Sequence, residues 1–92
     1  MVVIADLIIS PEVEAKIRQK PNHRLTGQEV REAVVYAVDA QARWVEDERH
    51  GRRLMVRSST YKGRPVIAYM IPQNPDDENE GTFVLLTAMT NA

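Results

Sequence analysis

The hydrophobic pattern of this chain changes its period once, near residue 42, and this change limits the folds that the chain can adopt. Up to about residue 39, after one short apolar segment, apolar residues recur with the spacing of one helix face. Beyond residue 42 they alternate with polar residues, as in strands that bury one side. The sequence therefore predicts an α+β domain in which helices precede most of the sheet.

The first part of the chain predicts one strand and two helices. Residues 2–9 (VVIADLII) are β-branched and apolar, which favours a strand. Ser10 followed by proline is typical of a helix start, and the next proline ends this first helix near residue 20. Thr26 and Glu29 have the spacing of a capping box, so we expect a second helix from there to about residue 39.

The second part predicts four strands, which short turns and one long acidic loop connect. Short connections join antiparallel neighbours. We therefore expect an N-terminal strand, two helices and a four-stranded antiparallel meander, with both helices packed on one face of the sheet. Residues 1–92 are expected to form a single domain. The four predicted strands are 42–48, 53–61, 65–71 and 82–89.

The composition excludes several kinds of site. Without cysteine, the chain has no disulfide, no thiolate metal ligand and no cysteine nucleophile. His23 and His50 are too far apart in sequence for a zinc motif, and the acidic segment 76–81 lacks the glutamate that completes a calcium loop. We expect no metal or other cofactor. The apolar start lacks the features of a signal peptide and no segment has the length of a membrane span, so a cytoplasmic protein is expected.

Charge is distributed unevenly along the chain, although its net value is only −1. Residues 43–64 contain seven basic and three acidic side chains, and residues 76–80 are strongly acidic. Such a separation favours a binding face for an anion; a solvated surface of mixed sign is the alternative. In strand 53–61, alternation places Leu54 and Val56 on the helix side. Three polar or basic residues then point to the opposite side: Arg53, Arg57 and Tyr61.

Three segments stand in an order that is familiar from a known family: NHRLTGQEV, SSTYKGRPVIAY and FVLLTAM. From roughly Ser10 to Met89 the chain resembles the BrnT family of ribonuclease toxins, which belong to bacterial type II toxin–antitoxin systems and share the compact fold of the wider RelE-like toxins. The family has lysine and glycine around its histidine, where this chain has Asn22 and Arg24. The family arginine of the last strand is replaced by Met89.

The resemblance implies an endoribonuclease that cuts RNA without a metal, through the 2′-hydroxyl of the RNA itself. Histidine suits the proton transfers of such a reaction, and arginine suits the charge of the phosphorane. The implied partners are RNA and a cognate antitoxin protein, with no membrane. The implied catalytic residues are His23, Arg57 and Arg53, and the implied RNA-binding residues are Arg24, His50, Tyr61, Lys62 and Arg64.

A second hypothesis is a catalytically inactive scaffold of the same type. In that case the sheet binds a protein partner or another copy of the chain, and a homo-oligomer is an option under either hypothesis. Met89 and the near-neutral net charge favour this alternative. The sequence leaves the choice between the two open.

Overall fold

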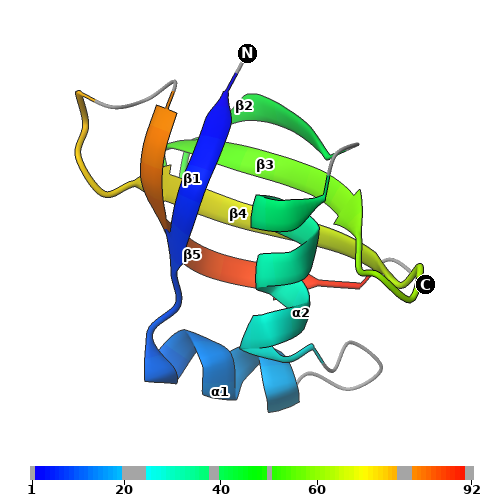
Figure 1. The fold of residues 1–92 in the computed structure, drawn as a ribbon. Helices are drawn as coiled ribbons and strands as arrows, with labels where there is room; N and C mark the ends of the chain where they lie inside the picture. The colour runs from blue at the N-terminus through cyan, green and yellow to red at the C-terminus, as the bar shows by residue number, and fades with distance from the viewer. Residues whose placement is uncertain (1, 20–24, 38–39, 50, 77–79, 91–92) are drawn as a thin grey trace.

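The computed structural model describes residues 2–19, 25–37, 40–49, 51–76 and 80–90. Within them, a strand and two helices precede four further strands, and the second helix continues as a π-helix (Figure 1). The elements in chain order are β1 (Val3–Ile8), α1 (Pro11–Gln19), α2 (Gly27–Arg31), the π-helix η1 (Glu32–Tyr36), β2 (Gln41–Asp47), β3 (Gly51–Ser59), β4 (Pro65–Pro72) and β5 (Glu80–Met89).

The strands form one five-stranded mixed sheet in the order β1-β5-β4-β3-β2. The predicted four-stranded antiparallel meander is therefore wrong, because β1 joins the sheet as a fifth strand and runs parallel to β5. The physical reason is that β5 pairs with strands on both of its edges: one edge pairs with β4 and the other with β1. On that second edge the buried side chain of Leu7 aligns with Phe83, two residues far apart in sequence.

Both helices begin where their capping residues predict. The Val13 amide donates to the Ser10 hydroxyl at 3.2 Å, ahead of α1. At α2 the capping box is complete: Glu29 N donates to Thr26 Oγ1, and Thr26 N donates to Glu29 Oε1, each at 3.1 Å. The second helix is shorter than predicted, because η1 ends at Tyr36 and the backbone of Ala37 is extended.

The core lies between the sheet and the helical segments, of which α1 contacts β5 and η1 contacts β1 and β3. On β3 and β4 the buried residues alternate with half-buried or exposed ones. Neither of the two described helices covers the side to which those alternating residues point, and we call this side the open face (Figure 1). The core consists of Leu7, Ile17, Leu25, Val30, Ala33, Val34, Leu54, Val56, Val66, Ala68, Met70, Phe83, Leu85 and Ala88.

The two edges of the sheet differ. In β1 the register shifts between Ile4 and Asp6, which marks a bulge. Arg31 of α2 donates to the carbonyl of Leu7 at 2.6 Å and pairs with Asp6 at 3.0 Å, so a helical side chain occupies this edge. In β2 all seven residues pair with β3 without a shift in register. Among the described segments, no helix is long and apolar enough to cross a membrane.

Candidate functional site

Among the described residues, those predicted to carry function do not come together in one place. Arg53 and Arg57 lie on the open face. Arg64 lies in the turn before β4, and its side chain contacts Glu29 at the start of α2. Three others lie outside the described residues, so their predicted roles stay predictions: His23, Arg24 and His50.

Arg53 is held within the sheet. Its guanidinium lies 4.6 Å from the centre of the Tyr69 ring and 3.4 Å from Asp47 Oδ2. Only 14% of its side chain is exposed. A guanidinium that stacks on an aromatic ring and pairs with a carboxylate has little freedom to follow a ligand. Arg53 is therefore suited to fixing the surface rather than to binding an anion.

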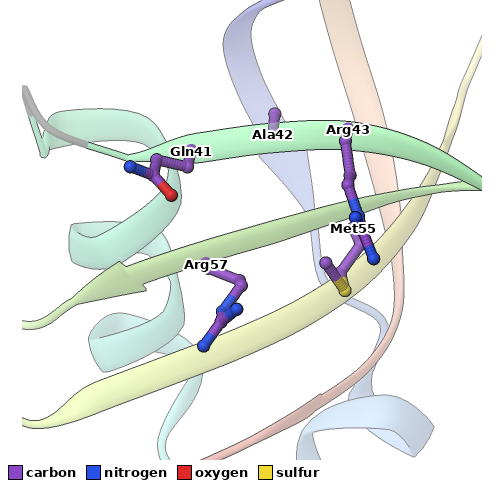
Figure 2. A pocket seen from close by; sticks show the side chains of 5 residues that line it. All are labelled: Gln41, Ala42, Arg43, Met55 and Arg57. Atoms are coloured by element: carbon purple, nitrogen blue, oxygen red, sulfur yellow. The ribbon is translucent and has the colours of Figure 1, made fainter.

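Arg57 lies two residues further along β3 in different surroundings. It is exposed and lines a shallow hollow of about 270 Å³ together with Arg43, Gln41, Ala42 and Met55 (Figure 2). No carboxylate of the described residues pairs with either Arg57 or Arg43. The hollow is therefore a place where two arginines face solvent without a described counter-charge.

The register of the β2–β3 hairpin explains how this hollow forms. Gln41 aligns with Arg57, and Arg43 aligns with Met55, so the two arginines are diagonal neighbours on one face. Diagonal neighbours on paired strands lie roughly 7–8 Å apart, within reach of long side chains. In Figure 2 both side chains lie on the same side of the hairpin. The hollow can therefore offer two guanidinium groups to one anion or to two adjacent ones.

The rest of the open face is mostly apolar. In the row that contains Arg57, the aligned residues on the next two strands are Ile67 and Met89. In the neighbouring row, Met55 aligns with Tyr69. Met89 thus lies in the same row as Arg57, two strands away, and adds no positive charge to it.

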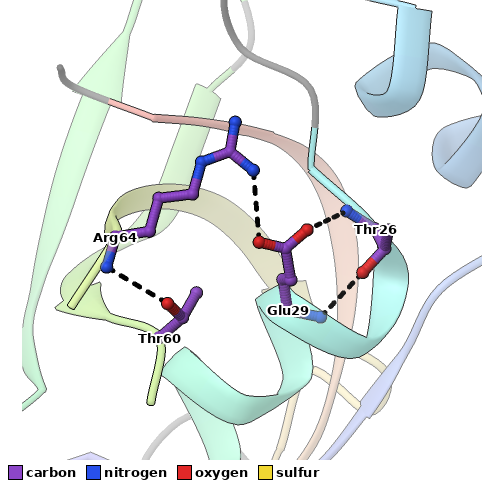
Figure 3. A network of polar contacts seen from close by, with 4 residues as sticks. All are labelled: Thr26, Glu29, Thr60 and Arg64. Carbon is purple, nitrogen blue, oxygen red and sulfur yellow. Dashed lines mark hydrogen bonds and ion pairs between the residues drawn. The ribbon is translucent and has the colours of Figure 1, made fainter. Parts of the chain in front are cut away.

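Arg64 belongs to a separate network at the start of α2 (Figure 3). Its guanidinium pairs with Glu29 at 3.1 Å, and its amide donates to the Thr60 hydroxyl at 3.1 Å. The same Glu29 carboxylate closes the capping box with Thr26. Arg64 thus connects the turn between β3 and β4 to the helix. Its guanidinium, which was predicted to bind RNA, already has the Glu29 carboxylate as a partner.

Two further predicted residues lie in that turn. Strand β3 ends at Ser59, so Tyr61 does not continue the alternation and is not part of the sheet face, contrary to the prediction. Tyr61 is 71% exposed, and Lys62 beside it is also exposed. Gly63 completes the turn with a φ of +82°, a conformation that residues with a Cβ rarely adopt. The turn presents an aromatic ring and a cation to solvent, and neither residue lines the hollow.

Sequence reasoning missed Gln41 and Met55 and left Arg43 out of the candidate site. The signal that identifies them is the hairpin register, which depends on where the turn closes. The predicted strands 42–48 and 53–61 place the turn between residues 48 and 53, whereas in the structure β3 begins at Gly51, which aligns with Asp47. A change in register alters which residues share a face and a row, so the neighbours of Arg57 were not predictable from the pattern alone.

Within the described part of the chain, no group of three or more histidine, aspartate or glutamate side chains is placed to hold a metal ion. In comparisons with known proteins, no family model, no curated protein and no solved structure matches this chain.

Proposed function

We propose that this chain is a toxin-type endoribonuclease that cleaves RNA through its 2′-hydroxyl without a metal, and that the open face binds the RNA backbone. The observation that carries the proposal is the hollow with Arg57 and Arg43, two exposed arginines without a carboxylate partner among the described residues. The resemblance to the BrnT family supplies the reaction.

The chemistry of the reaction suits such a pair of arginines. When the 2′-oxygen attacks the phosphorus, negative charge grows on the phosphate oxygens. A guanidinium is permanently charged and matches two oxygens at once, so it stabilises the transition state more than the ground state. Arg57 is assigned to the phosphate at the cut, and Arg43 to the same phosphate or to its neighbour. His23 is assigned to proton transfer on the strength of the resemblance.

The test compares purified variants on a fluorescent single-stranded RNA. Arg57→Ala is expected to lower kcat about 100-fold or more, as the loss of a group that stabilises the transition state does, while the far-ultraviolet circular dichroism is unchanged. Arg57→Lys keeps the charge without the fork and is expected to restore activity only in part. Arg18→Ala is the matched control, because Arg18 is an exposed arginine that pairs with Glu14 on α1. Equal activity of Arg57→Ala and Arg18→Ala contradicts the proposal.

A variant that is expected to gain activity provides a second test of the ribonuclease proposal. Met89→Arg adds a cation to the row of Arg57 and Ile67, at the position where the resembling family has one. It is expected to raise cleavage above the unmodified chain and to make RNA binding more sensitive to salt, because each added phosphate contact steepens the salt dependence. Cleavage that is unchanged in Met89→Arg, despite tighter binding, contradicts the assignment of catalysis to this row.

A non-catalytic binding module is the second candidate, and the apolar part of the open face favours it. Val45, Met55, Ile67 and Ile71 lie on this face without a covering helix, and exposed apolar surface of this kind often marks a protein interface. An antitoxin or other partner with acidic side chains would place them on Arg43 and Arg57. A folded chain that neither binds nor cleaves RNA, and that is captured by such a partner, decides for this candidate.

A further inference from the structure

Strand β2 presents a free edge for another strand. It is the last strand of the sheet, and it pairs only with β3 among the described strands. All seven of its residues are in register, and it contains no proline, lysine or bulge. Proline, lysine and bulges are devices with which proteins prevent an edge strand from pairing. Other charged side chains also protect an edge, and β2 carries three of them: Arg43, Glu46 and Asp47. The opposite edge is protected in two ways: β1 carries a bulge, and Arg31 of α2 donates to the carbonyl of Leu7.

The residues of β2 are complementary to a second copy of β2 running in the opposite direction. If the open faces of both copies point to the same side, each residue must align with one that lies on the same face. Such pairing is possible only if both aligned residues have odd numbers or both have even numbers, because alternate residues lie on opposite faces. A register is centred on the residue that aligns with its own copy at the two-fold axis. A register centred on Arg43 places two arginines opposite each other, and one centred on Glu46 places two glutamates opposite each other. Both are unfavourable.

The register centred on Val45 instead pairs opposite charges twice. Arg43 of each copy aligns with Asp47 of the other, and Val45 meets Val45 at the two-fold axis. Asp47 already accepts bonds from the Arg49 amide at 2.7 Å and from Arg53. On the other face Glu46 of one copy aligns with Trp44 of the other, whose ring is covered by the Arg52 guanidinium at 4.3 Å. This contact also brings opposite charges together.

We propose that the chain forms a symmetric dimer through antiparallel pairing of β2 with β2 of a second copy, in the register centred on Val45. The dimer has a continuous ten-stranded sheet, with five strands from each copy. The two-fold axis stands perpendicular to the sheet, so both hollows that contain Arg57 lie on the same side of the dimer. The proposal does not depend on the ribonuclease activity. In the dimer Arg43 has Asp47 of the second copy as a partner, so Arg57 is the arginine of each hollow that remains without a carboxylate partner among the described residues.

Single cysteines test this register directly, because the chain contains no cysteine of its own. Aligned residues on antiparallel strands have Cα atoms about 4.5–5.5 Å apart, which a disulfide can span. Val45→Cys is therefore expected to form a covalent dimer on mild oxidation. Met55→Cys is the matched control, half-buried on the same face of β3. Its two copies would be about 20 Å apart, because three strand spacings across the sheet and four residues along it separate them. Covalent dimer yield is expected to differ at least tenfold between the two variants.

Three outcomes overturn the proposal. The first is a wild-type protein that sediments as a monomer at the highest soluble concentration. The second is equal crosslinking of Val45→Cys and Met55→Cys. The third is stronger crosslinking of Arg43→Cys or Trp44→Cys than of Val45→Cys, which indicates another register.

Charge reversal tests the same interface without oxidation. Arg43→Asp alone opposes two carboxylates, and Asp47→Arg alone opposes two guanidinium groups, so each variant is expected to be monomeric. When the two variants are mixed, both contacts pair an aspartate of one variant with an arginine of the other, so a heterodimer is expected. Sedimentation of a mixture in which one variant carries a fluorophore detects it. Circular dichroism confirms that each variant is folded. A mixture that stays monomeric overturns the proposal, and Val45→Cys provides the result if Asp47→Arg does not fold.

Discussion

Arg53 and Arg57 lie two residues apart on one strand and point to the same face, yet their surroundings differ. Arg53 stacks on Tyr69 and pairs with Asp47, whereas Arg57 is exposed beside Arg43. The same residue type therefore contributes to stability at one position and is available for a ligand at the other. Alternation in the sequence places both on one face, but it does not distinguish these roles.

At the residue scale this difference predicts that the two arginines contribute unequally to stability. Arg53→Ala is expected to lower the free energy of unfolding by about 1 kcal/mol, because it removes the contact with Tyr69 and the pairing with Asp47. Arg57→Ala is expected to change it by less than about 0.5 kcal/mol, as an exposed substitution usually does. Urea unfolding, followed by the fluorescence of Trp44, measures both. A larger loss in Arg57→Ala than in Arg53→Ala contradicts this division of roles.

At the element scale, sequence and structure agree where a local signal exists. The caps at Ser10 and Thr26 were predictable, because each bond joins residues three apart. The end of the second helix was not, since the π-helix changes which residues share a face and ends the helix at Tyr36. For the site, the open-face position of Arg57 was predictable from alternation. Its neighbour Arg43 required the hairpin register.

The capping box at α2 gives the prediction at this scale. Thr26→Ala removes the acceptor for the Glu29 amide and is expected to lower the free energy of unfolding by about 1 kcal/mol. Thr26→Ser keeps a hydroxyl and is the matched control, with an expected change below about 0.5 kcal/mol. Thermal and urea unfolding by circular dichroism measure both. Equal losses in the two variants would show that the hydroxyl bond is not the source of the effect.

At the scale of the whole molecule, β5 organises the fold because it lies between β1 and β4. Its partner β1 is separated from it by most of the chain, and no local pattern indicates such a pairing. This is why the sequence predicted the meander but not the mixed sheet. The core depends on the same strand, since Phe83, Leu85 and Ala88 are all buried on it.

Substitutions on β5 test this dependence. Phe83→Ala is expected to lower the free energy of unfolding by about 3–5 kcal/mol, a large part of the 5–15 kcal/mol that is typical of a domain. Val84→Ala is the neighbouring control, and its loss is expected to be smaller because Val84 is only half-buried. Urea unfolding of both variants provides the comparison. Equal losses would mean that the buried side of β5 does not dominate stability.

The parallel pairing of β1 with β5 also bears on when the protein folds during its synthesis. The ribosome makes β1 first and its partner strand last, so the nascent chain carries an apolar strand whose neighbour does not yet exist. Burial of Leu7 against Phe83 must wait until both strands have left the ribosome. Completion of this sheet therefore waits for the synthesis of β5, and until then β1 is a segment that a chaperone can recognise.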